Sequence, residues 1–393
     1  MVFRPSSLVF GPSRRGCAGE NLPWKRLVFF LALLVLALSG CTGGSTRPVV
    51  KIGLAAPFTG FDEAQGYSLL YAVKLALQEA NQRGVAGYGV ELVALDDRNE
   101  PATAAQRARE FIADPDVLGV LGHLDGPAAA AAASEYRQAG LACITLAPGD
   151  GSGGPPVFRL FAPDTAQAAR AAAFATGPLG ARRLAILSDA ASRPLADLFS
   201  TQVRQGGAQV VHQAQVARWQ LDFQAEIAAL QQAAPELIFF AGRAAEGGVF
   251  LAQARERGLK ATFLGSSGCD DPRLVKLAGA AAEGAYCLSL VPEVAQVPAA
   301  DDFLARYRAF SPRPLGPYTA PAYDATRLLL AAIERAIRTA GRPSRAAVAA
   351  ELGRTRGFGG VAGEVTFDAR GANTAAKVYV YRIADGQTVP VQK

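Results

Sequence analysis

Beyond residue 48 the chain alternates short, almost wholly apolar runs with longer stretches in which apolar residues recur at helical spacing. In the first part, the apolar runs that predict strands are residues 49–54, 90–95, 117–121 and 142–146. The stretches that predict helices between them are residues 67–83, 103–113 and 128–139. Strands that are apolar throughout are typical of a parallel sheet covered by helices on both faces. The pattern therefore predicts a doubly wound α/β unit.

The same alternation starts again after residues 158–161. Strands are predicted over residues 184–187, 210–216, 237–240, 262–264 and 285–290, with helices over 165–176, 194–205, 223–233 and 244–257. Three helical stretches and two strands follow, over residues 301–310, 320–339, 345–352, 364–367 and 378–382. This predicts a second α/β unit, after which the chain returns to complete the first. Ligands of such sheets bind at the carboxyl ends of the strands, so we expect function in the strand-to-helix loops.

The N-terminal region has the layout of a secretion signal. Residues 27–38 form an apolar run that follows Lys25 and Arg26, as in a signal peptide. The alternative interpretation is a membrane-spanning helix, but the run is shorter than the ~20 residues that such a helix needs. The run ends in Leu38-Ser39-Gly40-Cys41, which resembles the bacterial lipobox, where the cysteine is acylated and the chain is cut before it. We predict a signal peptide over residues 1–41, whose start codon is assigned too far upstream, and lipid attachment at Cys41. Residues 42–48, rich in Gly, Ser and Thr, are predicted to be a flexible tether.

The charge of the chain does not indicate a nucleic-acid partner, although its pI is about 9.1. Five basic residues and one acidic residue precede Cys41, which accounts for +4 of the formal net charge of +6 and leaves +2 for the rest. The remaining arginines are scattered and form no basic stripe.

Cysteine and histidine usage gives no indication of a metal or cofactor. Of the cysteines beyond the lipobox, Cys269 and Cys287 are a candidate disulfide, while Cys143 lies in an apolar run and is predicted to be a buried thiol. Residues 265–268, Gly-Ser-Ser-Gly, are one residue shorter than the Gly-x-Ser-x-Gly nucleophile elbow of hydrolases and do not match it. The sequence therefore predicts neither a cofactor nor an enzyme.

Short motifs along the chain resemble those of one family. They include Lys51-Ile52-Gly53-Leu54, Pro57-Phe58-Thr59-Gly60, Glu79-Ala80-Asn81-Gln82-Arg83-Gly84, Leu95-Asp96-Asp97, Leu121-Gly122-His123, Phe158-Arg159, Phe263-Leu264-Gly265, Glu283-Gly284 and Ala322-Tyr323-Asp324-Ala325. In this order and spacing they resemble the type I periplasmic binding proteins, of the leucine/isoleucine/valine-binding type, over nearly the whole chain beyond the lipobox.

The resemblance implies an α/β fold of two doubly wound parallel-sheet lobes joined by a three-segment hinge. The crossovers would lie near residues 159–163, 290–292 and 367–375. We expect residues 49–161 plus 291–367 to form the N-terminal lobe and residues 162–290 plus 368–393 the C-terminal lobe. In this family the lobes close on a small-molecule ligand, and the ABC permease and ATPase subunits respond to the closed form. The protein is expected to be a monomer.

The resemblance also implies a ligand site, which departs from the family pattern in the first lobe. Family members hold the ligand carboxylate there with hydroxyl groups, but the serine position falls on Gly126, after Asp125, and the threonine position on Gly149, before Asp150. Ala147 matches a position that acts through its backbone. Main-chain N–H groups at helix N-termini could replace the hydroxyl groups, or these residues could simply form tight turns.

The second set of matching positions also departs from the family. The aromatic residue that closes over the ligand falls on Gln65, two tyrosine positions fall on Arg193 and Arg243, and the amino-binding acid falls on Ser267. Tyr318 matches an aromatic lining position. The loss of that acid and the presence of two guanidinium groups predict an anionic ligand, unless the arginines face solvent and Asp125 or Asp150 supplies the negative partner.

Together these features predict an extracytoplasmic, lipid-anchored solute-binding protein of a branched-chain amino acid-type ABC importer. The ligand is expected to be a small polar or anionic molecule, such as an amino acid or a related carboxylate or amide. The alternatives are a sensory ligand-binding subunit on the same fold and an extracytoplasmic hydrolase.

Overall fold

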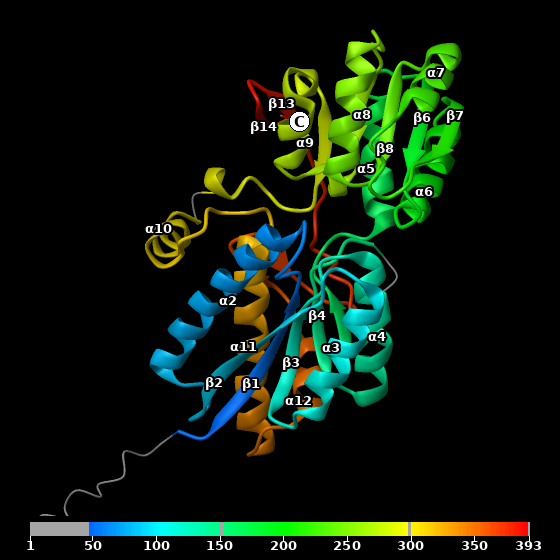
Figure 1. The fold of residues 1–393 in the computed structure, drawn as a ribbon. Coiled ribbons are helices and arrows are strands. Elements are labelled where there is room, and N and C mark those ends of the chain that lie inside the picture. Colours follow the sequence, from blue (N-terminus) through cyan, green and yellow to red (C-terminus); the bar gives the residue numbers. More distant parts are fainter. Residues whose placement is uncertain (1–46, 150–152, 298–299, 392–393) are drawn as a thin grey trace, which may run out of the picture. The chain divides into compact units, whose positions relative to one another are not determined.

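The computed structural model describes residues 47–149, 153–297 and 300–391 (Figure 1). The predicted signal peptide, the lipobox with Cys41 and most of the tether lie outside the described residues. Within the described ranges, no helix combines the length and the hydrophobicity that crossing a bilayer requires.

The first lobe is built on a five-stranded, wholly parallel sheet with the order β2-β1-β3-β4-β5. Its strands are β1 Val49–Ala56, β2 Gly89–Asp96, β3 Val117–Gly122, β4 Ala142–Thr145 and β5 Val157–Arg159. Its helices are α2 Glu63–Arg83, α3 Pro101–Ala113, α4 Gly126–Ala139, α10 Asp301–Phe310, α11 Thr319–Ala340 and α12 Arg345–Gly353.

Helices cover both faces of this sheet, which explains why the residues of β3 are buried throughout. Ile52 and Leu54 of β1 pack in one core with α2, α11 and α12. Val120 of β3 and Cys143 of β4 face the opposite core, formed with α3 and α4. The chain therefore returns to the first lobe after the second, as the late helical stretches predict.

The second lobe is built on a seven-stranded sheet with the order β14-β13-β10-β9-β8-β6-β7. Its strands are β6 Arg183–Ser188, β7 Gln209–Gln215, β8 Leu237–Ala241, β9 Thr262–Gly265, β10 Tyr286–Ser289, β13 Tyr379–Ala384 and β14 Gln387–Pro390. Its helices are α5 Asp164–Thr176, α6 Arg193–Gln205, α7 Gln224–Ala233, α8 Ala244–Glu256 and α9 Arg273–Ala278. Short 3-10 turns occupy η1 Ser267–Cys269, η2 Gly279–Ala282 and η3 Val294–Gln296.

Successive residues of β6 face opposite cores, as alternation along a strand requires. Leu184 and Ile186 pack with α5 and α6, whereas Ala185 and Leu187 pack with α7, α8 and α9. The burial of both faces of the sheet explains the continuous apolar runs in the sequence.

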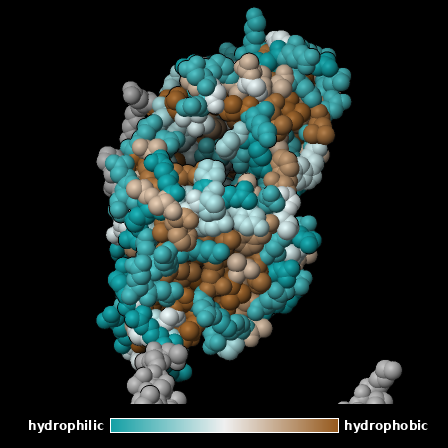
Figure 2. Space-filling view, turned by 60° about the vertical axis from the view of Figure 1, so that its left-hand side comes forward, coloured by the Kyte–Doolittle hydropathy of each residue, from teal (hydrophilic) through white to brown (hydrophobic). Residues whose placement is uncertain are grey.

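Hydrophilic residues cover much of the visible outer face of the molecule, with apolar residues between them (Figure 2).

The chain passes between the two sheets three times, after β5, after β10 and before β13. The predicted fold class, two parallel-sheet α/β lobes, is confirmed. Several strands differ from the prediction, among them β5, which was not predicted although most of it is buried. The segment near Glu364 forms only the short β12 Glu364–Val365, which pairs with β11 Phe358–Gly359 in a separate ribbon. The edge strand β14 was not predicted, because all four of its residues are exposed and carry no apolar pattern.

Arg345, the first residue of α12, binds backbone carbonyl oxygens at the end of α3 and the start of β3. Its guanidinium donates to the carbonyl oxygens of Val117 and Ile112 at 2.9 and 3.0 Å, and also to those of Phe111 and Asp114. Arg345→Ala is expected to lower the free energy of unfolding by about 2 kcal/mol, because hydrogen bonds from a charged donor are lost. Urea unfolding measures this change. The exposed Arg342→Ala is the control, and equal losses in both variants would contradict this role.

Candidate functional site

A cavity of about 130 Å³ lies where the strand-to-helix loops of the two lobes meet. Its polar lining includes residues that follow the carboxyl ends of strands in both sheets: Asp62 after β1, Asn99 after β2, Asp125 after β3, Asp189 after β6, Arg243 after β8 and Ser267 after β9. This is the position at which doubly wound sheets bind ligands. Its volume is close to the ~150 Å³ of cavities that admit a benzene-sized molecule.

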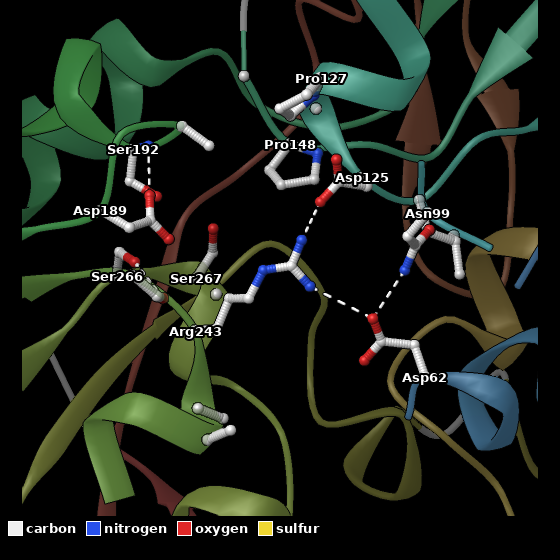
Figure 3. A pocket seen from close by; sticks show the side chains of 18 of the residues that line it. Asp62, Asn99, Asp125, Pro127, Pro148, Asp189, Ser192, Arg243, Ser266 and Ser267 are labelled. Atoms are coloured by element: carbon white, nitrogen blue, oxygen red, sulfur yellow. Dashed lines mark hydrogen bonds and ion pairs between the residues drawn. The ribbon is translucent and has the colours of Figure 1, made fainter. Parts of the chain in front are cut away.

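Arg243 of the second lobe bridges two carboxylates of the first lobe (Figure 3). It directly precedes α8, and its Nη1 lies 3.3 Å from Asp62 Oδ2, while its Nη2 donates to Asp125. Asp62 and Asp125 are the residues directly before α2 and α4. The side chains of Asp62 and Asp125 are 8% and 6% exposed, so the first-lobe side of this bridge is shielded from solvent. Dissolved salt therefore weakens the attraction less than it would between exposed charges.

A second bridge joins the lobes beside the first. Arg273 at the start of α9 donates from Nη1 to Asp62 Oδ1 at 2.8 Å and from Nε to Asp271 Oδ1 at 2.8 Å. Gln65 of α2 donates from Nε2 to Asp271 Oδ2 at 2.8 Å. Asp62 therefore accepts from both Arg243 and Arg273 and is the carboxylate on which the two bridges converge.

The environment shifts the pKa values of the two first-lobe acids in opposite directions. Burial raises the pKa of Asp62, but hydrogen bonds from Arg273 and Asn99 more than offset this and hold it below 3.8. Burial raises the pKa of Asp125 above 3.8, since the positive charge of Arg243 offsets it only in part. As the pH falls, Asp125 is therefore the first of the two to take up a proton.

Further polar groups line the second-lobe side of the cavity. Asp189 accepts from the backbone N–H of Ser192 at 2.7 Å, and its other oxygen points towards the side where Ser267 and Arg243 lie (Figure 3). The Ser267 hydroxyl donates to Gln167 Oε1 at 2.7 Å, and Gln167 in turn donates to Asp164 at 3.1 Å. Of the residues that the structure describes, four carboxylates and two guanidinium groups line the cavity, which gives these groups a formal net charge of −2.

Two aromatic rings from opposite lobes meet at the cavity. The rings of Phe61 and Trp219 lie edge to face with centroids 4.9 Å apart, and both residues line the cavity. Trp219 has a φ of 66°, which is unfavourable for a bulky side chain. Its backbone N–H donates to Glu246 Oε1 at 2.7 Å, and this contact holds the loop in place.

The structure brings most of the sequence-predicted site residues together. The cavity is lined by Gln65, Asp125, Gly126, Gly149, Arg243, Ser267 and Tyr318. Ala147 is 2% exposed and does not line the cavity. Its backbone N–H donates to Thr145 Oγ1 inside the first lobe. Asp150 lies outside the described residues.

Arg193 is not brought into the cavity. Its side chain is 68% exposed and its Nε lies 3.8 Å from Asp197 of the same helix. The cavity side of this loop is formed instead by Ala191 and Ser192, since Arg193 is already the first residue of α6 and projects outward.

The candidate disulfide between Cys269 and Cys287 is wrong. Both residues are buried free thiols, as is Cys143. Cys269 is the last residue of η1, and its Sγ lies 3.6 Å from the carbonyl oxygen of Gly242, while Cys287 of β10 belongs to the core that includes α8. Burial raises the pKa of Cys269 and of Cys287 well above 9.0, so they act as small apolar side chains.

Among the described residues, sequence reasoning missed eight charged or polar ones that line the cavity, which are Asp62, Asn99, Asp164, Gln167, Asp189, Ser192, Ser266 and Arg273. Asn99 and Asp189 follow predicted strands, so the rule that sites lie at strand ends could have found them. Arg273 lies on α9, a helix of six residues that the apolar pattern does not reveal.

Comparison with known proteins agrees with this geometry. Residues 49–388 match the model of a family described as periplasmic binding protein. A Leu/Ile/Val-binding protein homolog of Brucella melitensis is 27% identical over 350 residues, covering 87% of this chain and 94% of the relative.

Two solved structures extend the likeness to three dimensions. A leucine-binding protein of Thermotoga maritima has a TM-score of 0.78 and 28% identity, covering 87% of this chain and 98% of its own. A branched-chain amino acid transporter substrate-binding protein of Streptococcus pneumoniae, solved with isoleucine, has a TM-score of 0.78 and 26% identity, covering 86% and 97%. The chain therefore belongs to the periplasmic binding protein family, and within it to the type I proteins of the leucine, isoleucine and valine-binding kind.

Proposed function

We propose that the protein captures a small polar solute in the cavity between its lobes and delivers it to the membrane subunits of an ABC importer. The observation that supports this most is the convergence of Asp62, Asp125, Asp189, Arg243 and Ser267 from strand-end loops of both lobes on one cavity. A solute that contacts both walls favours the arrangement in which the lobes meet, and an importer can recognise that arrangement.

The cavity supports a small solute with several hydrogen-bonding groups. A volume of about 130 Å³ suits a molecule of amino acid size, and most of the polar lining is charged. The anionic ligand expected from two arginines finds little support, because Arg193 lies outside the cavity and Arg243 is paired with two carboxylates. Asp189 is proposed to contact the solute directly.

The proposal places the protein outside the cytoplasm, as its family implies. Attachment to the membrane through an acylated Cys41 and function as a monomer are part of the proposal. An acyl chain contributes about 0.8 kcal/mol for each buried methylene, so two or three chains would retain the protein beside its importer.

Thermal unfolding with a panel of solutes tests capture. The panel is L-leucine, L-arginine, agmatine, putrescine, benzoate and glutarate, each at about 1 mM. A solute bound only by the folded protein at 100 times its Kd adds about 2.7 kcal/mol of stability and raises the Tm. The expected result is a rise with at least one member, and ATP-driven uptake of that member by vesicles that carry the importer and this protein. No rise with any member, or uptake equal without the protein, would contradict the proposal.

A further inference from the structure

The guanidinium group of Arg243 occupies a prepared place on the first lobe. It reaches across from the second lobe and contacts Asp62 and Asp125, whose side chains are 8% and 6% exposed. Figure 3 shows it lying between these carboxylates in the middle of the cavity. A cation of this chain is thus already seated at the first-lobe wall of the solute site.

This wall is held by the first lobe itself. Asn99 Nδ2 donates to Asp62 Oδ2 at 2.9 Å, and the backbone N–H of Ala128 donates to Asp125 Oδ1 at 3.3 Å. The carboxylates therefore keep their positions without Arg243. Asp125 also takes the place at the N-terminus of α4 where a ligand carboxylate would otherwise bind.

Asn99 provides a separate indication that the wall accepts a donor. It is 2% exposed and lines the cavity, and its Oδ1 has no hydrogen-bond partner among the described residues. A buried acceptor without a donor is costly, so a ligand that supplies an N–H group there is favoured. Arg243 leaves this amide oxygen without a donor. A planar guanidinium group carries five N–H donors, more than the two carboxylates alone require.

The charge balance of the cavity agrees with a cation. Among the described lining residues, the four carboxylates of Asp62, Asp125, Asp164 and Asp189 outnumber the two guanidinium groups of Arg243 and Arg273. An anionic solute would enter a site already rich in negative charge, whereas a cationic solute would reduce that excess.

We infer that Asp62, Asn99 and Asp125 form a receptor for the guanidinium or alkylammonium group of the solute, and that Arg243 occupies this receptor while no solute is present. The inference rests on the proposed capture of a solute and names its chemical class. Arg243 then competes with the solute and links the lobes until the solute replaces it.

Removal of the resident cation tests the receptor without knowledge of the natural solute. The probe is methylguanidinium, titrated by calorimetry into the wild type, Arg243→Ala, Arg243→Gln and the control Arg338→Ala, which removes an exposed arginine paired with Glu334. Acetate serves as the anionic probe. We expect Arg243→Ala and Arg243→Gln to bind one methylguanidinium at least tenfold more tightly than the wild type and Arg338→Ala. Adding Asp125→Asn should weaken that binding by about tenfold or more, since a hydrogen bond to a charged group is lost.

Two variants keep the test decisive. If Arg243→Ala does not fold, Arg243→Gln carries the test, because it keeps a polar side chain at this position and removes the positive charge that competes with the probe. Methylguanidinium binding equal to that of Arg338→Ala, or acetate bound more tightly than methylguanidinium, would overturn the receptor. Failure of the proposed function looks different, since the wild type would then capture no solute and support no uptake while the variants still bound methylguanidinium.

Discussion

Replacing Asp62 with asparagine is expected to lower the free energy of unfolding by about 2 kcal/mol and to let the two lobes separate. Asp62 accepts from Arg273 at 2.8 Å and lies 3.3 Å from Arg243, so both bridges between the lobes depend on its charge. An amide keeps the shape but leaves two partly buried guanidinium groups short of negative charge. Urea unfolding reports the stability, and small-angle scattering should show a larger radius of gyration.

Asp302→Asn is the matched control for this prediction. Asp302 also pairs with an arginine, Arg306 at 2.8 Å, but both belong to α10 in the first lobe and Asp302 is 81% exposed. Its loss should change stability by less than about 0.5 kcal/mol and leave the radius of gyration unchanged. If Asp62→Asn behaves as Asp302→Asn does, the bridges do not hold the lobes together.

Gly122→Ala is expected to destabilise the fold by about 3 to 5 kcal/mol. Gly122 ends β3 with a φ of +123°, and a Cβ there would lie 2.0 Å from the backbone oxygen of Ala55 on the neighbouring strand. Relief of that clash requires β1 and β3 to move apart. Because the loop that follows carries Asp125, the variant should also lose the contact between Asp125 and Arg243. Urea unfolding measures the loss of stability.

Gly140→Ala separates the clash from the backbone conformation. Gly140 ends α4 with a φ of +64°, and a Cβ there would meet no atom within 4 Å. Its replacement should cost only about 1 to 2 kcal/mol, the penalty of a left-handed conformation for an L-residue. Similar losses for the two variants would show that contact with β1 does not constrain Gly122.

The sequence was sufficient to predict the sheets because burial on both faces leaves a local pattern. Every residue of β3 and β8 is buried, and these runs are apolar in the sequence. The ribbon of β11 and β12 and the edge strand β14 left no such pattern, because they lie outside the doubly covered part of the sheets. The pairing of these strands depends on turns, which the pattern of apolar residues does not indicate.

The cavity was less predictable because charges acquire their role from partners distant in sequence. Arg243 was expected at the ligand site and lines the cavity, but its neutralisation by Asp62 and Asp125 depends on contacts across 181 and 118 residues. Arg193 was expected beside it, and a small difference in where α6 begins turned it outward. Residue types therefore identified the loops, whereas the net charge of the site required the structure.

Calorimetric titration of the solute that gives the largest thermal shift in the panel shows whether the solute is captured in this cavity. We expect one site per chain in the wild type and binding at least about tenfold weaker in Asp189→Asn, which removes a carboxylate that lines the cavity. Asp197→Asn, which changes an exposed acid on α6, should bind as the wild type does. Binding that is equally strong in all three proteins would contradict capture in this cavity.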